Sequence, residues 1–326
     1  MRFHRGIALA AASALVLGAA ACGSDDDDKS GGGGSDQNLS GRIAIDGSST
    51  VFPFAQAAAE QFQQENPGVK ITVGQSGTGG GFEKFCAGET QISDASRPIK
   101  PDEEVPVCEK NGIEYGEAQV ANDGIAVVTN KQTTIDCMTT AQLEQLWKPG
   151  SEVDNYTAIA PKLPDQDVKL FGPGTDSGTF DFFTDKINGE EGASRKDYQP
   201  SEDDNVLVQG VAGSAGGLGY FGFSYYEQNQ DKLNLVGVDD GDGCVKPSVE
   251  TIQNGSYKPL SRPLFMYVSD EAIKQPEVKA FLEYAVKNEK AIAEAAQLVP
   301  LTSQQEAKAK ENLKAIEAGK SSATNS

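Results

Sequence analysis

The chain of 326 residues is poor in the groups that enzymes use most often. It has a single histidine, His4, which lies in an N-terminal leader that is expected to be removed. A Ser-His-Asp triad, a Cys-His pair and histidine-bound metal sites are therefore excluded. The five cysteines show no Cys-x-x-Cys spacing, which argues against a thiolate metal site. We predict a protein that is not an enzyme and that needs no cofactor or metal.

Positive charge and long apolar runs are also scarce. Lysine and arginine number 28 against 48 aspartate and glutamate residues, which gives a formal net charge of −20. Nucleic acids and anionic membrane surfaces are poor partners for such a chain. The longest apolar run, residues 7–21, is shorter than the roughly 20 residues that a membrane-spanning helix needs. The run therefore does not predict a transmembrane anchor.

That run instead belongs to a secretory leader. Arg2 and Arg5 precede it, and small residues lead from it to Cys22. The pattern predicts a bacterial lipoprotein signal over residues 1–22, with cleavage in front of Cys22 and acylation of its sulfur. Residues 23–40, rich in glycine, serine and aspartate, are expected to form a flexible tether. We expect an extracytoplasmic protein, in the periplasm or at the cell surface, that contacts the cell membrane through its lipid alone.

The rest of the chain alternates between short β-branched runs and helical patterns. The expected strands are residues 42–46, 70–74, 125–129, 168–171 and 233–238. The expected helices are residues 54–65, 82–87, 140–147, 180–187, 205–211, 276–294 and 303–318. Such alternation predicts an α/β protein with mainly parallel sheets.

Three strands are followed by a short segment of glycine, serine and threonine that leads directly into a helix. These segments are residues 46–51, 74–81 and 172–179. A helix start exposes unpaired backbone N–H groups and a partial positive charge, so it can bind an anion. Glycine lets the backbone approach a ligand, and serine or threonine adds a hydroxyl donor. Three such starts around one ligand could satisfy the four oxygens of a phosphate, and the distant negative charges are screened over about 8 Å.

Each segment alone is more often a simple helix cap or a mobile loop, so the prediction depends on their joint occurrence. No Gly-Lys-Ser or Gly-Lys-Thr follows any of them, which excludes the phosphate loop of nucleotide hydrolases. One charged partner is expected, and Arg97 is the best placed because its planar guanidinium can grip two oxygens. An arginine there could also form only a surface salt bridge. The segments together predict a site for a tetrahedral oxyanion.

These segments resemble those of the phosphate-binding proteins of ABC-type phosphate importers, the PstS family. The resemblance extends from residue 43 to about residue 301 and is carried by residues 45–53, 76–82, 94–99, 123–127, 172–183, 201–205, 217–221 and 261–264. It implies the periplasmic-binding-protein type II fold. In that fold two α/β lobes with mixed, mainly parallel sheets are joined by crossing strands, and the ligand binds in the cleft between them.

The expected first lobe comprises residues 41–121 and 261–320, and the expected second lobe comprises residues 122–260. Residues 321–326 are expected to be a disordered tail.

Four cysteines remain after Cys22, and an even count in an exported protein suggests two disulfides. Of the three possible pairings, we favour Cys86 with Cys108 and Cys137 with Cys244, because each pair then lies within one lobe.

The resemblance implies ligand contacts at the three helix starts. We expect the contacts from Ser49, Thr50, Val51, Thr78, Gly79, Ser177, Gly178 and Thr179.

Two positions depart from the best-known members of the family. Those members carry an arginine a few residues before their Ser-Gly-Thr, where this chain has residues 172–174, and an aspartate where this chain has Ser96. We expect Ser96 to contact the ligand as well, Arg97 to replace the guanidinium and Asp123 to replace the carboxylate. A carboxylate can accept a hydrogen bond from a protonated phosphate oxygen. Sulfate has no such proton and would be repelled, so the carboxylate would favour phosphate.

The expected function is therefore that of a monomeric solute-binding lipoprotein. It would capture inorganic phosphate by closing its lobes around the anion and deliver it to an ABC permease. Three alternatives remain open at this stage. These are a binding protein for another oxyanion such as molybdate, tungstate or sulfate, an exported phosphatase or other hydrolase, and a surface adhesin or sensor.

Overall fold

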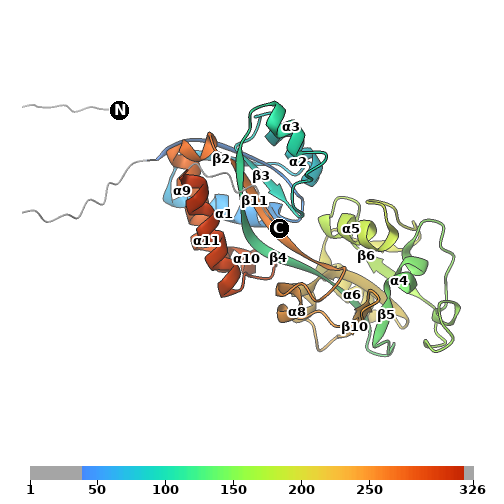
Figure 1. The fold of residues 1–326 in the computed structure, drawn as a ribbon. Coiled ribbons are helices and arrows are strands. Elements are labelled where there is room, and N and C mark those ends of the chain that lie inside the picture. Colours follow the sequence, from blue (N-terminus) through green and yellow to red (C-terminus); the bar gives the residue numbers. More distant parts are fainter. Residues whose placement is uncertain (1–38, 319–326) are drawn as a thin grey trace, which may run out of the picture. The chain divides into compact units, whose positions relative to one another are not determined.

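The computed structural model describes residues 39–318, which form helices around a mixed sheet (Figure 1). The expected signal, the lipidated Cys22, most of the tether and the expected tail lie outside these residues. Within the described part, the strand order along the main path of the sheet is β2-β1-β3-β11-β4-β8-β6-β7, and β9 joins β4, β5 and β10 beside it.

At one edge of the sheet, one strand lies between two parallel neighbours. The strand β1 (Ser40–Gly47) pairs in parallel with β2 (Gly68–Val73) on one side and with β3 (Ile92–Ala95) on the other. The helix α1 (Phe52–Glu65) connects β1 to β2, and α2 (Gly77–Cys86) connects β2 to β3. Parallel neighbours require such crossover helices, so the ends of β1 and β2 both lead into helix starts.

Two long strands cross from one half of the protein to the other (Figure 1). The strand β4 (Tyr115–Asn130) pairs antiparallel with β11 (Ser261–Ser269) through its first half. Its second half pairs antiparallel with β8 (Gly217–Gly222) and β9 (Leu233–Asp239). The register between β4 and β11 places Arg262 opposite Asp123.

The remaining strands extend the sheet beyond β4. They are β5 (Cys137–Thr139), β6 (Lys169–Gly172), β7 (Gln199–Pro200) and β10 (Cys244–Val245). The helices of this half are α4 (Thr140–Trp147), α5 (Gly178–Phe183), α6 (Asp204–Gly213), α7 (Phe223–Glu227) and α8 (Val249–Gln253). The helices of the other half, besides α1 and α2, are α3 (Val105–Lys110), α9 (Pro276–Lys287), α10 (Glu289–Ala295) and α11 (Ser303–Glu317).

Two separate hydrophobic cores stabilise the two halves. The first core takes its buried residues from positions 43–121 and 264–316, and a smaller cluster beneath α2 and α3 adjoins the same elements. The second core takes its buried residues from positions 125–260, together with Val299. We call the elements around the first core lobe 1 and those around the second core lobe 2. Since apolar burial is the main favourable term in folding, each lobe has its own source of stability.

Both disulfides match the favoured pairing. Cys86 at the end of α2 is bonded to Cys108 in α3, and Cys137 in β5 is bonded to Cys244 in β10. Each bond lies within one lobe, so this prediction is confirmed.

The structure also differs from the sequence-based expectations, most clearly in the sheet and in one long helix. Parallel pairs do not predominate in the sheet, because β4 and β11 run antiparallel to their neighbours where they cross between the lobes. The helix expected over residues 276–294 is divided at Asn288 into α9 and α10. The Asn288 side chain donates to the carbonyl of Tyr284, and such local bonds compete with the helical pattern.

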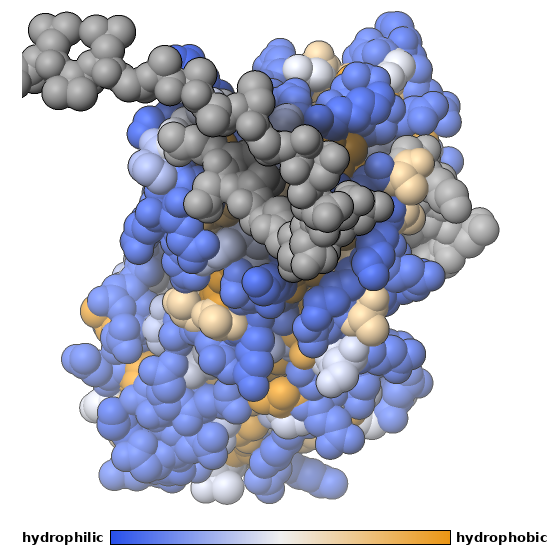
Figure 2. All heavy atoms as spheres, turned by 90° about the vertical axis from the view of Figure 1, so that its left-hand side faces the viewer, coloured by the Kyte–Doolittle hydropathy of each residue, from blue (hydrophilic) through white to orange (hydrophobic). Residues whose placement is uncertain are grey.

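The surface of the described residues is mostly polar. The face in Figure 2 is largely hydrophilic, with hydrophobic residues in small separate patches. Large hydrophobic side chains are exposed at Val107, Val206 and Val249. In the described part of the chain, no helix combines the length and the apolar character that crossing a bilayer requires.

Candidate functional site

A cavity of about 520 Å³ lies where the three predicted helix starts meet. Lobe 1 contributes the segments before α1 and α2, and lobe 2 contributes α5 and the residues after it. In Figure 1, α2 and α5 lie on the same side of the crossing strands. The cavity is lined by Ser48, Ser49, Thr50, Ser76, Gly77, Thr78, Gly79, Gly80, Ser96, Arg97, Lys100, Gly178, Asp181, Phe182, Asp185, Lys186, Glu191 and Arg262.

The first segment is fixed by the buried Ser48. Its N–H donates to the carbonyl of Asp94 at 2.9 Å, and its hydroxyl accepts the N–H of Thr50 at 3.2 Å. The N–H of Val51 donates to the carbonyl of Ser48 at 3.2 Å, and the Val51 side chain is fully buried in the first core. Of the three residues expected to contact a ligand here, Ser49 and Thr50 line the cavity, whereas Val51 does not.

The second segment leaves the start of α2 without a side-chain cap. Both the N–H and the hydroxyl of Ser76 donate to Asp46, at 3.0 and 2.6 Å, so Ser76 does not cap the helix. The first amides of a helix have no intrahelical acceptor, and here they border the cavity. The hydroxyls of Thr78 and Ser96 lie 3.0 Å apart, and the N–H of Ser96 donates to Thr78 at 3.2 Å. Ser96 therefore orients Thr78 at the helix start.

Close packing explains the glycine run in this segment. A Cβ at Gly81 would lie 2.5 Å from the Cα of Gly47, and Gly77 has a φ of 79° that favours glycine. The start of α2 can therefore lie directly on the end of β1 only if Gly81 carries no side chain, whereas Gly77 is favoured by its backbone conformation alone.

The third segment brings lobe 2 against lobe 1. The hydroxyl of Ser177 caps α5 by accepting the N–H of Thr179 at 3.2 Å. A Cβ at Gly178 would lie 2.3 Å from Oγ1 of Thr50 and 2.5 Å from Oγ of Ser49. Only glycine allows this approach between the lobes. Gly178 lines the cavity, whereas Ser177 and Thr179 do not.

Arg262, which the sequence analysis did not select, has the central position among the cationic groups. Its Nε donates to Asp123 at 3.1 Å, and its Nη2 donates to Thr50 at 2.6 Å and to the carbonyl of Gly178 at 3.1 Å. Its guanidinium lies 3.8 Å from the centre of the Phe182 ring. Among the described residues none binds its Nη1, and the side chain lines the cavity while being only 11% exposed.

The two residues that were expected to supply the charged contacts have other partners. Asp123 is buried, is paired with Arg262 and is not among the lining residues. Arg97 lines the cavity, but both of its terminal nitrogens donate to Glu104, at 2.9 and 2.7 Å. The bond to Glu104 raises the pKa of Arg97, against the opposing effect of burial. Arg97 therefore lies at the rim, with its charge largely balanced.

Comparison with known proteins identifies the family of the chain. Residues 30–289 match the model of the PBP superfamily domain. The chain is 45% identical to the protein SphX of Synechococcus elongatus over 262 residues, which are 79% of this chain and 77% of that protein. It is 39% identical to the phosphate-binding protein PstS of Staphylococcus saprophyticus over 266 residues, covering 80% and 81% of the two chains. The chain belongs to the PstS family.

Solved structures agree with this family membership. A possible phosphate-binding protein from Planctomyces limnophilus is 44% identical with a TM-score of 0.81, over 85% of this chain and 99% of that chain. An ABC-type phosphate transport receptor from Vibrio cholerae, 18% identical with a TM-score of 0.63, covers 80% of this chain and 100% of that chain and shares the fold. The predicted fold class, two α/β lobes with a mixed sheet, is confirmed.

In this PstS-family chain, three carboxylates also line the cavity. They belong to Asp181, Asp185 and Glu191 of lobe 2. Burial, and to a smaller extent the negative charge of Glu191, raise the pKa of Asp181 to about 6 against the opposing effect of Arg262. Among the described residues, the carboxyl of Asp181 has no hydrogen-bond partner although it lines the cavity.

Beneath the helix starts, Asp94 is fully buried in β3. In the described part of the chain neither of its side-chain oxygens has a hydrogen-bond partner. Burial raises the pKa of Asp94 well above its usual range, and the negative charge of Asp46 adds to this effect. The folded state therefore holds this proton more tightly than the unfolded state, where the pKa is about 3.9.

Replacing Asp94 by asparagine should stabilise the protein at high pH. The pKa of Asp94 is higher in the folded state than in the unfolded state. Its contribution to the free energy of unfolding is therefore complete below the unfolded pKa and is lost as the pH rises towards the folded pKa. We expect Asp94→Asn to raise the free energy of unfolding at pH 8 by about 1–3 kcal/mol and to change it little at pH 4. Urea unfolding at both pH values measures this. Equal effects at pH 4 and pH 8 would contradict the prediction.

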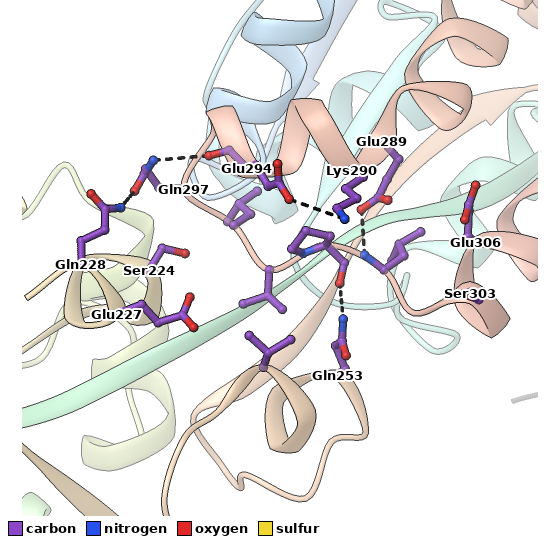
Figure 3. Close-up of a pocket in the computed structure, with 15 residues that line it drawn as sticks. Ser224, Glu227, Gln228, Gln253, Glu289, Lys290, Glu294, Gln297, Ser303 and Glu306 are labelled. Carbon is purple, nitrogen blue, oxygen red and sulfur yellow. Dashed lines mark hydrogen bonds and ion pairs between the residues drawn. The ribbon is translucent and has the colours of Figure 1, made fainter. Parts of the chain in front are cut away.

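A second cavity, of about 540 Å³, is shown in Figure 3. Two of the helices that line it, α8 and α10, lie on the opposite side of the crossing strands from α2 and α5 (Figure 1). Its walls are α7 and α8 of lobe 2 and α10 with the residues after it in lobe 1. Gln228 binds Gln297 across it, and Gln253 donates to the carbonyl of Pro300 at 2.8 Å. Its charged lining residues are one lysine and four glutamates, Lys290, Glu227, Glu289, Glu294 and Glu306. This excess of carboxylates does not favour an anion, so the first cavity is the better candidate for an oxyanion site.

Proposed function

We propose that the chain binds inorganic phosphate in the cavity between its lobes and delivers it to the permease of an ABC importer. One observation carries this proposal: the start of α2, the hydroxyls of Ser49, Thr50 and Thr78, and the guanidinium of Arg262 border the same cavity. Backbone amides and hydroxyls satisfy anion oxygens at hydrogen-bond range without a large net charge. Relatives named phosphate-binding protein PstS support the choice of phosphate.

In this proposal Nη1 of Arg262 donates to the phosphate. Arg97 contributes positive charge at the rim of the cavity. Asp123 acts through Arg262, because its bond to Nε fixes the plane of the guanidinium. Ser96 acts through the hydroxyl of Thr78. Ser177 and Thr179 hold the start of α5, so that Gly178 can reach the ligand from lobe 2.

The lobes should divide near residues 122 and 261 and close around the ligand by rotation about β4 and β11. Arg262 already contacts both lobes, through Thr50 of lobe 1 and Gly178 of lobe 2. A ligand bound to the same guanidinium would favour the closed form, because its contacts with both lobes exist only there. The leader sequence and Cys22 support export and lipid anchoring to the cell membrane.

Isothermal calorimetry on protein freed of bound anion tests the proposal. We expect phosphate to bind with a dissociation constant of about 1 μM or lower, and sulfate, molybdate and tungstate to bind at least about a hundredfold more weakly. If one of the other oxyanions bound more tightly than phosphate, that oxyanion would be the ligand instead. Hydrolysis of a chromogenic phosphate ester by the purified protein would instead indicate an enzyme.

A further inference from the structure

Asp46 connects two of the segments that form the phosphate cavity, although it does not line the cavity itself. It is the last but one residue of β1 and the first residue of the first segment. Its Oδ1 accepts the N–H and the hydroxyl of Ser76, at 3.0 and 2.6 Å, in the second segment. Its Oδ2 accepts Nζ of Lys84 at 2.5 Å. Ser76 immediately precedes α2 and Lys84 lies in its last turn, so one carboxylate holds both ends of the helix.

The space around Asp46 is shaped for this contact. A Cβ at Gly74 would lie 2.5 Å from Oδ2 of Asp46, so only glycine leaves room for the carboxylate. The Asp46 side chain is 13% exposed. Burial disfavours its charge, but the hydrogen bonds from Lys84 and Ser76 outweigh this effect and lower the pKa of Asp46. The carboxylate is therefore ionised at neutral pH and keeps its acceptor role.

The bonds to Asp46 also decide which donors remain for a ligand. The N–H and the hydroxyl of Ser76 both point to Asp46, although Ser76 borders the cavity. The donors that remain in this segment are the amides at the start of α2 and the hydroxyl of Thr78. Those amides can serve a ligand only if the helix start keeps its place relative to Ser49 and Thr50.

We propose that Asp46 is a positioning residue of the phosphate site, which holds the start of α2 in register with the Ser49–Thr50 turn. The proposal rests on the proposed function, since it concerns the same cavity. A geometric requirement supports it. The two segments follow different strands, and within the described residues Asp46 is the side chain whose hydrogen bonds join the end of β1 to both ends of α2.

The experiment compares three variants of the purified protein by phosphate calorimetry. Asp46→Ala should weaken phosphate binding by about 10- to 100-fold, the range found when a group that orients a ligand contact is lost. Asp46→Asn keeps an oxygen acceptor for Ser76 and should stay within about threefold of the wild type. The matched control Lys84→Met removes the partly exposed ion pair but not the bonds to Ser76, and should also stay within about threefold.

These variants separate positioning from a general loss of stability. If Asp46 acted only on folding, the three variants would lose affinity in proportion to their loss of stability in urea. Wild-type affinity for Asp46→Ala, or equal losses for Asp46→Asn and Asp46→Ala, would overturn the proposal.

A measurement without ligand distinguishes this proposal from the proposed function. Amide hydrogen exchange at residues 76–80 of the ligand-free protein should be faster in Asp46→Ala than in the wild type and in Lys84→Met. Unchanged exchange would overturn the positioning role. If the wild-type chain failed to bind phosphate, the proposed function would fall, and the exchange result would still decide whether Asp46 orders the start of α2.

Discussion

Replacing Arg262 by alanine is expected to weaken phosphate binding by at least about 30-fold. The substitution removes the Nη1 donor from the cavity together with the bonds from Nη2 to Thr50 and Gly178. It also leaves Asp123, which is 5% exposed, as a buried carboxylate without its partner. An unpaired buried charge is costly, so the free energy of unfolding should fall by about 3–5 kcal/mol.

A second variant separates the loss of binding from the loss of stability. Arg262→Lys keeps a positive charge beside Asp123 but loses the planar fork that serves several acceptors at once. It should therefore recover part of the stability and still bind phosphate at least about tenfold more weakly than the wild type. Calorimetry measures binding and urea unfolding measures stability.

Arg97→Ala is the matched control for Arg262. From the sequence alone we expect Arg97→Ala to weaken phosphate binding at least tenfold. The structure assigns the larger loss to Arg262, because Arg97 binds Glu104 through both terminal nitrogens and its side chain is 33% exposed. A greater loss of phosphate affinity for Arg97→Ala than for Arg262→Ala would indicate that Arg97 makes the main guanidinium contact.

Replacing Asp181 by asparagine should narrow the preference for phosphate over sulfate by at least about tenfold at pH 8. The carboxyl of Asp181 lines the cavity, and burial together with Glu191 raises its pKa to about 6. At pH 8 it is ionised, so it can accept the proton of phosphate as a hydrogen bond and it repels sulfate. An asparagine side chain can donate to either anion, so sulfate should gain affinity.

The effect of Asp181→Asn should depend on pH in a definite direction. Below about pH 6 the wild-type carboxyl is protonated and neutral, so the wild type and the variant should discriminate similarly at pH 5. Competition calorimetry at pH 5 and pH 8 provides the measurement. Asp185→Asn is the control, because Asp185 also lines the cavity but is 46% exposed and paired with Lys186. An unchanged preference at pH 8, or the same change in Asp185→Asn, would contradict the assignment to Asp181.

Local chemistry made much of the fold and part of the site predictable. The helix at residues 140–147 was placed to the residue as α4, and Thr139 caps it with a reciprocal bond to Gln142. The three glycine, serine and threonine segments do meet in one cavity, because parallel strands of each lobe deliver their ends to the same edge. The two disulfides followed from the division of the cysteines between the lobes.

The contacts that the sequence did not reveal depend on pairing between distant strands. Arg262 and Asp123 are 139 positions apart, and only the antiparallel register of β4 and β11 places them opposite each other. Local patterns carry no information about that register. Residues 261–264 carry part of the family resemblance, and a charged residue in a crossing strand beside an aspartate on its partner strand is a usable signal. The short strand β3, buried throughout, was missed because four residues show no clear period.

The second cavity has a consequence for the rate at which a ligand leaves. Since β4 and β11 lie between the two cavities, a rotation about these strands cannot widen both at once. If the lobes rotate as proposed, opening the anion cavity would narrow the space between α7 and α10 and bring Glu227 of lobe 2 towards Glu294 of lobe 1. Repulsion between these carboxylates would then raise the barrier to escape. In the proposed mechanism, the residence time of the anion would thus depend in part on side chains that the anion never touches.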